Sequence, residues 1–452
     1  MHPDGKAYGF DRGRRVFVPG SIPGETLTIM MEKRQIGYFV AEIMLIEQAS
    51  PNRITPFCKH AGLCGGCNWQ HIAYTHQLTL KSEIISEALI KQQIEFKIIA
   101  LVIPSPMQIQ FRNRTEYTFS SSRWFYESEG KVIDPVGRLA LGFNPEGMTE
   151  RIIDIEECWL QPHPAHHFSR LAKELAILHQ LEFWNPRLKT GLIRNLELKN
   201  NTANQWMLLV GFTQDDPRIG QYMKDLKDKL PKETQLFFTI LNDATKALGG
   251  EVAPFEQASG ELLEFSGKLK FRIRPSGFYQ TNPLQASILF KMVSELAAAK
   301  AEDIVYDLYT GAGTIALHVA HHANFVIGIE ANENSIEDAN YNAQINGIAN
   351  VRFIQGDVLA TFTSDFVDSN PKPSIVILDP PRSGTLIEIK KTILYAQPHT
   401  IIYVSCNPAA LAKDLKMLTT AYSIACIQPI DMFPHTHHIE TVVKLVRRSD
   451  WQ

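Results

Sequence analysis

The chain has 452 residues, a formal net charge of −3 and 44% hydrophobic residues, as expected of an ordinary globular protein of about two to four domains. It contains no run of about 18 apolar residues and no basic-then-apolar N-terminal signal, so we exclude a membrane-spanning protein and expect a cytoplasmic one. Because the net charge is slightly negative, binding to nucleic acid would have to come from local basic patches.

Residues 1–48 have the pattern of a small β-barrel. Short strands are predicted at 14–18, 25–31 and 38–46, with Pro-Gly turns between the first two. Small barrels of this kind often bind single-stranded nucleic acid, but a fold alone does not assign a function.

A group of cysteines follows the predicted barrel. Cys58, Cys64 and Cys67 are separated by five and two residues, and glycines between them allow the backbone to turn tightly. Three thiolates need a fourth ligand to hold either zinc or an iron–sulfur cluster, and Cys158 is the best distant candidate. The spacing alone does not decide between these two kinds of centre, but either one would pin two segments of the chain together. The remaining Cys426 is expected in the core.

The region from 74 to 265 is predicted to mix helices and strands. Residues 74–92 have the apolar periodicity of a helix, and a β-rich region runs from Phe111 to about residue 160. Arg112 and Arg114 follow Phe111 closely. They could bind phosphate and stack on a base, or they could lie on a solvated strand edge. Residues 163–265 alternate helix and strand without a pattern that indicates chemistry.

From about residue 270 the chain reads as strand–helix repeats. Strands are predicted at 304–307, 326–330, 351–354, 375–378, 401–405 and 439–445, which indicates a doubly wound α/β domain. The last of these strands is expected to close the sheet. We expect every residue singled out here to lie at the carboxyl end of a strand, where such sheets bind ligands. Those residues are Asp307, Glu330, Asp357, Asp379 and Cys406.

Cys406 is the residue around which the functional interpretation is built. It follows the strand 401–405 and precedes Asn407-Pro408, and a thiol there can act as a nucleophile once a neighbouring group activates it. A buried structural cysteine is the alternative. The turn Gly311-x-Gly313 also fits a dinucleotide-binding fingerprint, but Asp379-Pro-Pro-Arg382 has no role in hydride transfer.

The ordered motifs resemble those of the RNA uracil-5-methyltransferases. They are Phe278-Tyr-Gln-Thr-Asn282, Asp307-Leu-Tyr-Thr-Gly-Ala-Gly-Thr314, Asn342 to Asn350, Asp379-Pro-Pro-Arg382, Ser405-Cys-Asn-Pro408 and His438-Ile-Glu-Thr-Val442. The cysteines and the N-terminal barrel are similar to the ribosomal RNA branch of that family. The resemblance implies a multidomain α/β protein with an OB-like TRAM barrel (1–48), a central α+β RNA-binding domain (49–265) and a Rossmann-like class I methyltransferase domain (266–452).

The resemblance also implies details of two of these domains. It assigns a [4Fe–4S] cluster to Cys58, Cys64, Cys67 and Cys158, with zinc as the alternative, and the helix at 74–92 is expected to pack on the catalytic domain. The chain begins at about the position where the first strand of such a barrel would already have ended. We therefore expect a barrel that is incomplete at its N-terminus.

The same resemblance implies the site and the reaction. Cys406 would be the nucleophile that adds to C6 of a uracil, and Glu440 the base that removes the C5 proton after methyl transfer from S-adenosylmethionine. Separately from the resemblance, Arg382 could hold RNA phosphate or stabilise the enolate oxygen, and Arg112 and Arg114 are the other candidate RNA contacts. The implied cofactor contacts are Asp307, Tyr309, Gly311, Gly313, Thr314, Gln280, Glu330, Asp357 and Asp379.

The expected substrate is a uridine in 23S ribosomal RNA, methylated by a monomer. A transfer RNA uridine-5-methyltransferase and a non-catalytic RNA-binding iron–sulfur protein are the alternatives. Amino-methyltransferases use Asn-Pro-Pro followed by an aromatic residue, which Asp379-Pro-Pro-Arg382 does not match. Radical methylation normally uses C-x3-C-x2-C, which differs from the spacing here. His435, His437 and His438 form a cluster that we do not assign to a metal.

Overall fold

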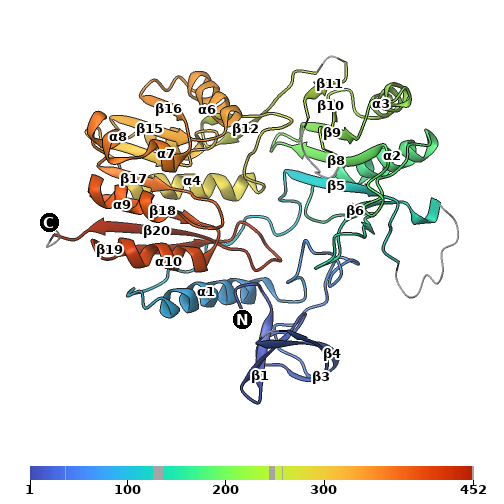
Figure 1. The fold of residues 1–452 in the computed structure, drawn as a ribbon, viewed down its shortest axis with the longest axis horizontal. Coiled ribbons are helices and arrows are strands. Elements are labelled where there is room, and N and C mark those ends of the chain that lie inside the picture. Colours follow the sequence, from blue (N-terminus) through green and yellow to red (C-terminus); the bar gives the residue numbers. More distant parts are fainter. Residues whose placement is uncertain (36, 126–135, 244–249, 257, 450–452) are drawn as a thin grey trace.

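The chain forms three parts that differ in architecture (Figure 1). The computed structural model describes residues 1–35, 37–125, 136–243, 250–256 and 258–449. A small N-terminal sheet lies at the bottom of Figure 1, a central mixed sheet at its right and an α/β domain at its left. None of the described helices has the length and apolar character needed to cross a membrane.

The N-terminal part is a twisted four-stranded sheet in the order β1-β2-β4-β3. Its strands are β1 (Ala7–Asp11), β2 (Arg14–Val18), β3 (Thr26–Gln35) and β4 (Tyr38–Gln48). β1 was not predicted, and β2 has the predicted bounds. β2 and β4 run parallel, whereas the other two pairs are antiparallel. Among the described residues the pairings leave β1 and β3 as edges, so closure into a TRAM-like barrel stays a prediction.

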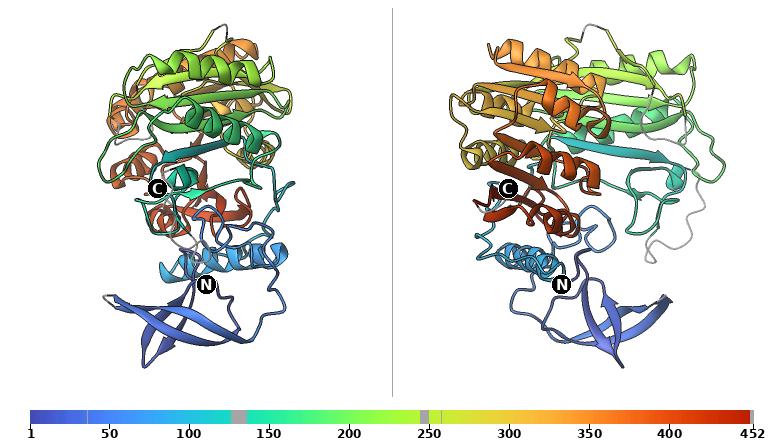
Figure 2. Two further views of the ribbon diagram at one scale, coloured as in Figure 1. Left: turned by 90° about the vertical axis from the view of Figure 1, so that its right-hand side faces the viewer. Right: turned by 60° about the vertical axis from the view of Figure 1, so that its left-hand side comes forward.

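The helix predicted at 74–92 is confirmed as α1 (Tyr74–Lys91). It belongs by sequence to the central region, yet it packs against α10 (Pro408–Leu418) of the α/β domain (Figure 2). Ile85, Ala88 and Leu89 of α1 are buried in one of the two cores of that domain, as expected. The amphipathic face of α1 therefore joins the N-terminal half of the chain to the catalytic half.

The central part is a seven-stranded sheet in the order β11-β10-β9-β8-β5-β6-β7. Helices α2 (Ala165–Leu178) and α3 (Arg218–Lys229) pack on it, and a 3-10 turn (Val136–Arg138) precedes β6. The strands are β5 (Arg114–Ser120), β6 (Ala140–Phe143), β7 (Ile153–Asp154), β8 (Ile193–Asn200), β9 (Trp206–Phe212), β10 (Gln235–Ile240) and β11 (Val252–Pro254).

The C-terminal part is the predicted α/β domain, with a sheet in the order β16-β15-β14-β17-β18-β20-β19. Its strands are β14 (Ile304–Leu308), β15 (Phe325–Glu330), β16 (Val351–Gln355), β17 (Ile375–Leu378), β18 (Thr400–Ser405), β19 (Tyr422–Ile430) and β20 (Glu440–Arg447). The helices are α4 (Pro283–Ala297), α5 (Thr314–Ala320), α6 (Glu333–Ile345), α7 (Val358–Thr361), α8 (Ser364–Ser369), α9 (Ile387–Ala396) and α10. β17 and β18 are buried throughout, as parallel strands covered on both faces must be.

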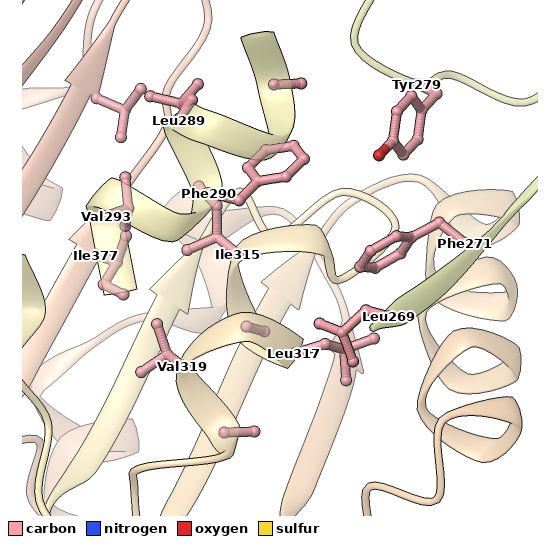
Figure 3. Packing of buried hydrophobic residues seen from close by; sticks show 14 of the residues in the cluster. Leu269, Phe271, Tyr279, Leu289, Phe290, Val293, Ile315, Leu317, Val319 and Ile377 are labelled. Atoms are coloured by element: carbon pink, nitrogen blue, oxygen red, sulfur yellow. The ribbon is translucent and has the colours of Figure 1, made fainter. Parts of the chain in front are cut away.

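A hairpin of β12 (Leu262–Ser266) and β13 (Leu269–Ile273) packs into the core of the α/β domain. Figure 3 shows Leu269 and Phe271 of β13 next to Leu317 of α5, with Phe290 and Ile315 nearby. The predicted domain limit at 265/266 falls inside this hairpin, and on packing the hairpin belongs with the C-terminal domain.

Two features of the C-terminal sheet correct the sequence interpretation. The last strand, β20, does not close the sheet, because it is inserted between β18 and the unpredicted edge strand β19. β20 is antiparallel to both neighbours, whereas β14 to β18 are mutually parallel. Cys426 lies beside a bulge in β19 and is partly exposed, so its assignment to the core was wrong.

Candidate active site

Cys406 lies in the turn that joins β18 to α10. It is the first residue after the buried strand and is itself only partly buried. Asn407 caps α10, because its side-chain oxygen accepts from the N–H groups of Ala409 at 3.0 Å and Ala410 at 3.4 Å. Pro408 then occupies the first helical position. The predicted location of the thiol, at the carboxyl end of a buried strand, is confirmed.

Glu440 lies beside Cys406 at the end of the β18–β20 ladder. The last pair of this ladder is Ser405 with Thr441, and Cys406 and Glu440 come next to this pair on their two segments of chain. The two side chains are close enough for the Glu440 carboxylate to act on the Cys406 thiol. Glu440 is the first residue of β20, near the start of the strand predicted at 439–445. It reaches the same edge of the sheet because β20 runs antiparallel.

The loop that carries Asp379 and Arg382 is held against the turn before α10. Asn407 Nδ2 donates to the backbone oxygen of Arg382 at 2.8 Å. Further along the loop, the N–H of Thr385 donates to Asp414 Oδ2 on α10 at 2.7 Å. These two contacts place an acid and an arginine beside the strand end that presents the thiol.

The charges around Cys406 have opposite effects on the pKa of its thiol. Burial, followed by the Glu440 carboxylate, raises the pKa of the Cys406 thiol to about 11, while Arg382 lowers this pKa and Asp379 raises it. Without ligand the thiol is therefore protonated at neutral pH. Arg382 is exposed and is the side chain whose charge favours the thiolate.

Glu440 is buried, and its pKa is raised well above the usual value, chiefly by burial and then by the nearby Asp379 carboxylate. Arg382 acts in the opposite direction. A carboxylate with a raised pKa is a stronger base than an ordinary one, because its protonated form is favoured. The chemistry available at this edge is thus a nucleophilic thiol paired with a proton acceptor.

A second group of acids lies at the ends of β14 and β15. Thr310 Oγ1 donates to Asp307 Oδ2 at 2.6 Å, whereas Asp307 Oδ1 is buried without a hydrogen-bond partner. Burial raises the pKa of Asp307 to about 7, and burial also raises that of Asp379 to about 7. Glu330 instead accepts from the N–H of Gly311 at 3.2 Å. An unsatisfied buried carboxyl oxygen fits a site that awaits a cationic or hydrogen-bonding ligand.

The glycine turn after β14 has the backbone of a ligand cradle. Tyr309 has a φ of 67°, and Gly311 and Gly313 have φ values of 54° and 77°. A non-glycine residue with positive φ is uncommon and marks either a turn or strain at a functional site. The Tyr309 hydroxyl lies 3.2 Å from Thr385 Oγ1, which links this turn to the loop of Asp379.

The remaining predicted cofactor contacts take part in local contacts of their own. Thr314 begins α5 directly after the glycine turn. Asp357 is exposed and caps α7, accepting from the N–H of Ala360 at 3.2 Å. Gln280 is partly exposed, and its backbone oxygen accepts from Asn113 Nδ2 at 3.1 Å. Their roles in binding a cofactor stay predictions.

A comparison with family sequence models decides the family. The model described as "tRNA (Uracil-5-)-methyltransferase" matches residues 221–448, half of the chain. The chain belongs to this family. It is an RNA methyltransferase of the kind that acts on uracil C5 and uses S-adenosylmethionine, as the motifs predicted.

Relatives match almost the whole length of this methyltransferase. A protein of Bacteroides thetaiotaomicron named "Uncharacterized RNA methyltransferase" is 35% identical over 99% of this chain and 100% of its own. A protein of the same name from Porphyromonas gingivalis is 36% identical over 96% of each chain. The crystal structure of Pyrococcus abyssi tRNA (uracil-54, C5)-methyltransferase with S-adenosyl-L-homocysteine is similar at a TM-score of 0.76, with 26% identity and 95% coverage of each chain.

The four predicted metal cysteines of the methyltransferase meet around one cavity. Cys58, Cys64, Cys67 and Cys158 all line a cavity of ≈ 410 Å³ between the loop 58–67 and the end of the β-rich region. Burial raises the pKa of each thiol, and the charges of the other cysteines raise the pKa of Cys67 further, to about 12. Four thiolates that line one cavity require a positive centre to offset their charges. The residues present therefore fit a metal group.

The arginines predicted to bind RNA make different contacts. Arg112 lines the cysteine cavity, and the Cys158 and Cys67 charges act on it. Arg114 pairs with Glu197, with Nε and Oε1 2.6 Å apart. Arg382 lies at the catalytic edge instead. An RNA contact of these three side chains stays a prediction.

Sequence reasoning missed the residues that hold the segment leading to Glu440. Tyr74 and Lys81 on α1 contact Asp431, which follows β19. The one available signal was a lysine on the apolar face of a predicted helix, between Leu78 and Ile84. The histidine cluster lies in the same segment, where the His435 N–H donates to Gln77 Oε1 at 2.9 Å.

Proposed function

We propose that this methyltransferase, acting as a monomer, methylates C5 of a uridine in 23S ribosomal RNA through a transient covalent bond to Cys406. The observation that carries the proposal is the juxtaposition of Cys406 and Glu440 at the end of the β18–β20 ladder, with Arg382 and Asp379 beside them. S-adenosylmethionine supplies an electrophilic methyl group at the acid-lined end of β14 and β15.

Cys406 and Glu440 act at two neighbouring atoms of the uracil ring, C6 and C5. The Cys406 thiolate adds to C6, and the electrons of the C5=C6 bond make C5 a nucleophile that accepts the methyl group. Glu440 then takes the C5 proton, and the double bond re-forms as the C6–S bond breaks. Arg382 offsets the Glu440 and Asp379 charges that hold the thiol protonated. The uridine must leave its stack to reach this edge, at a cost of a few kcal/mol.

The covalent step is tested with RNA that contains 5-fluorouridine. Fluorine at C5 cannot leave as a proton, so the adduct accumulates and survives denaturing electrophoresis. We expect the adduct with wild type and with Cys426→Ala, a cysteine outside the site, but not with Cys406→Ala. Full turnover of unmodified RNA by Cys406→Ala would refute the mechanism. A wild-type protein that forms no adduct and no 5-methyluridine would favour the non-catalytic RNA-binding alternative.

We propose a [4Fe–4S] cluster for Cys58, Cys64, Cys67 and Cys158. Tetrahedral zinc with bonds of about 2.3 Å needs sulfurs within about 3.8 Å of one another. Among the described residues, the cysteines form no group of three donor atoms within 4.8 Å. A cluster that offers each sulfur a different iron suits this wider spacing. Iron and sulfide analysis with Mössbauer spectra of anaerobically purified protein tests the assignment, and one zinc with four sulfur ligands would overturn it.

The RNA target rests on separate grounds. The four cysteines and the N-terminal sheet support ribosomal RNA, because they resemble that branch of the family. Transfer RNA is the second candidate, favoured by the similarity of the whole chain to the Pyrococcus abyssi transfer RNA enzyme. Mapping 5-methyluridine in both RNAs of a strain that lacks the gene decides between them. Loss confined to transfer RNA would refute the ribosomal assignment.

A further inference from the structure

A loop of the central domain brings together three side chains that the methyltransferase reaction does not use. Donor atoms of Glu157, His163 and His166 all lie within 4.8 Å of one another. Within the parts of the chain that the structure describes, no other three His, Cys, Asp or Glu side chains converge in this way. Glu157 precedes Cys158, and the two histidines flank the start of α2.

We propose that Glu157, His163 and His166 bind a divalent transition-metal ion of the zinc type at a site of its own. Two imidazole nitrogens and one carboxylate oxygen are the ligands that borderline cations such as Zn²⁺ and Co²⁺ prefer. Three protein ligands leave a fourth position for water, as the partial exposure of the site allows.

The distances suit a bound ion. His163 Nδ1 and His166 Nδ1 lie 3.1 Å apart, with ring planes at 82°. Bonds of about 2.0–2.1 Å in a tetrahedral zinc site separate two nitrogens by about 3.4 Å. A shift of a few tenths of an ångström would bring the two nitrogens to this separation. The Glu157 carboxylate oxygen lies within 4.8 Å of them and would move closer to complete the site. Without an ion, two Nδ1 atoms at this distance can form a hydrogen bond only if one of them carries a proton and the other accepts it.

The surroundings supply both favourable and unfavourable charge. The charge of the Glu157 carboxylate acts on His166 and also on Cys58. Arg170 and His167 also act on His166 and would oppose a cation. Arg170 is partly neutralised by Glu174, whose Oε1 lies 3.8 Å from its Nε. The net ligand charge still favours a cation, because the one anionic group is a ligand.

The proposed site is separate from the cysteine centre. Glu157 lines the cysteine cavity, whereas neither histidine does. An ion would tie the residue before Cys158 to the first turn of α2 and so fix the loop between them. Because the ion binds the folded form alone, it should raise the stability of the protein by mass action. The proposal does not depend on which group the cysteines hold.

The test measures zinc binding to the full chain by isothermal titration and by X-ray absorption. We expect one zinc with nitrogen and oxygen but no sulfur neighbours, in addition to any metal at the cysteines. The variant His163→Gln/His166→Gln should lose that one equivalent, and Glu157→Gln should weaken binding by about 10–100-fold. His167→Gln, at an exposed position one residue away, is the matched control and should bind zinc at least as tightly as wild type does, because His167 opposes a cation at His166.

Three results would overturn the proposal. They are zinc with sulfur neighbours only, zinc binding that is unchanged in the double histidine variant, and no saturable binding at all. A misfolded double variant is recognised by circular dichroism. In that case Glu157→Gln, which keeps size and hydrogen bonding, takes its place, and unchanged zinc affinity in this variant refutes the site.

Discussion

Lys81 and Asp431 form an ion pair that is closed off from solvent. Lys81 Nζ lies 2.5 Å from Asp431 Oδ1, and neither side chain is exposed. Lys81 also donates to the backbone oxygen of Phe433 at 3.1 Å, and the Tyr74 hydroxyl donates to Asp431 Oδ2 at 2.8 Å. The pair therefore fastens α1 to the segment that runs from β19 to Glu440.

Replacing Lys81 by Met should destabilise the protein strongly. Removal of one partner leaves a buried charge without compensation, which costs about 3–5 kcal/mol of unfolding free energy. The measurement is urea denaturation followed by circular dichroism. As a control, Arg187→Met breaks an exposed pair with Glu150, and such pairs contribute about 0–1 kcal/mol. Lys81→Met/Asp431→Leu should recover most of the loss, and equal stability of Lys81→Met and wild type would contradict the assignment.

The reactivity of the Cys406 thiol should follow the charges around it. Because burial and Glu440 raise its pKa to about 11 and Arg382 lowers it, Glu440→Gln should speed alkylation by iodoacetamide at pH 9. Arg382→Gln should slow it, and each change is expected to be several-fold, because a shift of one pKa unit alters the thiolate fraction about tenfold. Mass spectrometry measures the rate at Cys406 against Cys426, which is the internal control. Alkylation rates in both variants equal to that of wild type would show that these charges do not act on the thiol.

The stability of the ligand-free protein should depend on the ionisation of Asp307. Its folded pKa is raised from 3.8 to about 7, so the native state holds a proton that the unfolded chain releases. The contribution of Asp307 is present in full below about pH 4 and is lost as the pH rises to about 7. The stability difference between wild type and Asp307→Asn should thus fall by about 4 kcal/mol from pH 4 to pH 8. A difference that does not change with pH, measured by urea denaturation at each pH, would refute this.

The two glycines of the ligand turn should differ in their tolerance of alanine. A Cβ at Gly313 would lie 2.8 Å from Phe353 Cζ and 3.2 Å from Ala339 Cβ, whereas a Cβ at Gly311 meets nothing within 4 Å. Both residues have positive φ, so each substitution costs about 1 kcal/mol in backbone strain. Gly313→Ala should cost about 1–3 kcal/mol more, as overpacking does. Thermal unfolding of the ligand-free variants measures the difference, and equal losses would argue against the clash.

The sequence by itself determined the elements that depend on local pattern. The run of β-branched residues before Cys406 and the Asn407-Pro408 cap define a buried strand, a thiol and a helix start within a few residues. The same holds for the glycine turn after β14 and for the bunched cysteines. Periodicity and capping depend on residues that are close in the sequence, so these elements can be predicted from short stretches of it.

Only the tertiary structure decided which distant residues meet. Glu440 lies beside Cys406 because β20 enters the sheet antiparallel between β18 and β19, and no local pattern specifies that order. Lys81 finds its partner 350 residues away, and Arg112 lies beside the cysteines and not on an open strand edge. A buried charged side chain is tolerated only beside a partner of opposite charge. The tertiary structure brings that partner from a distant part of the sequence.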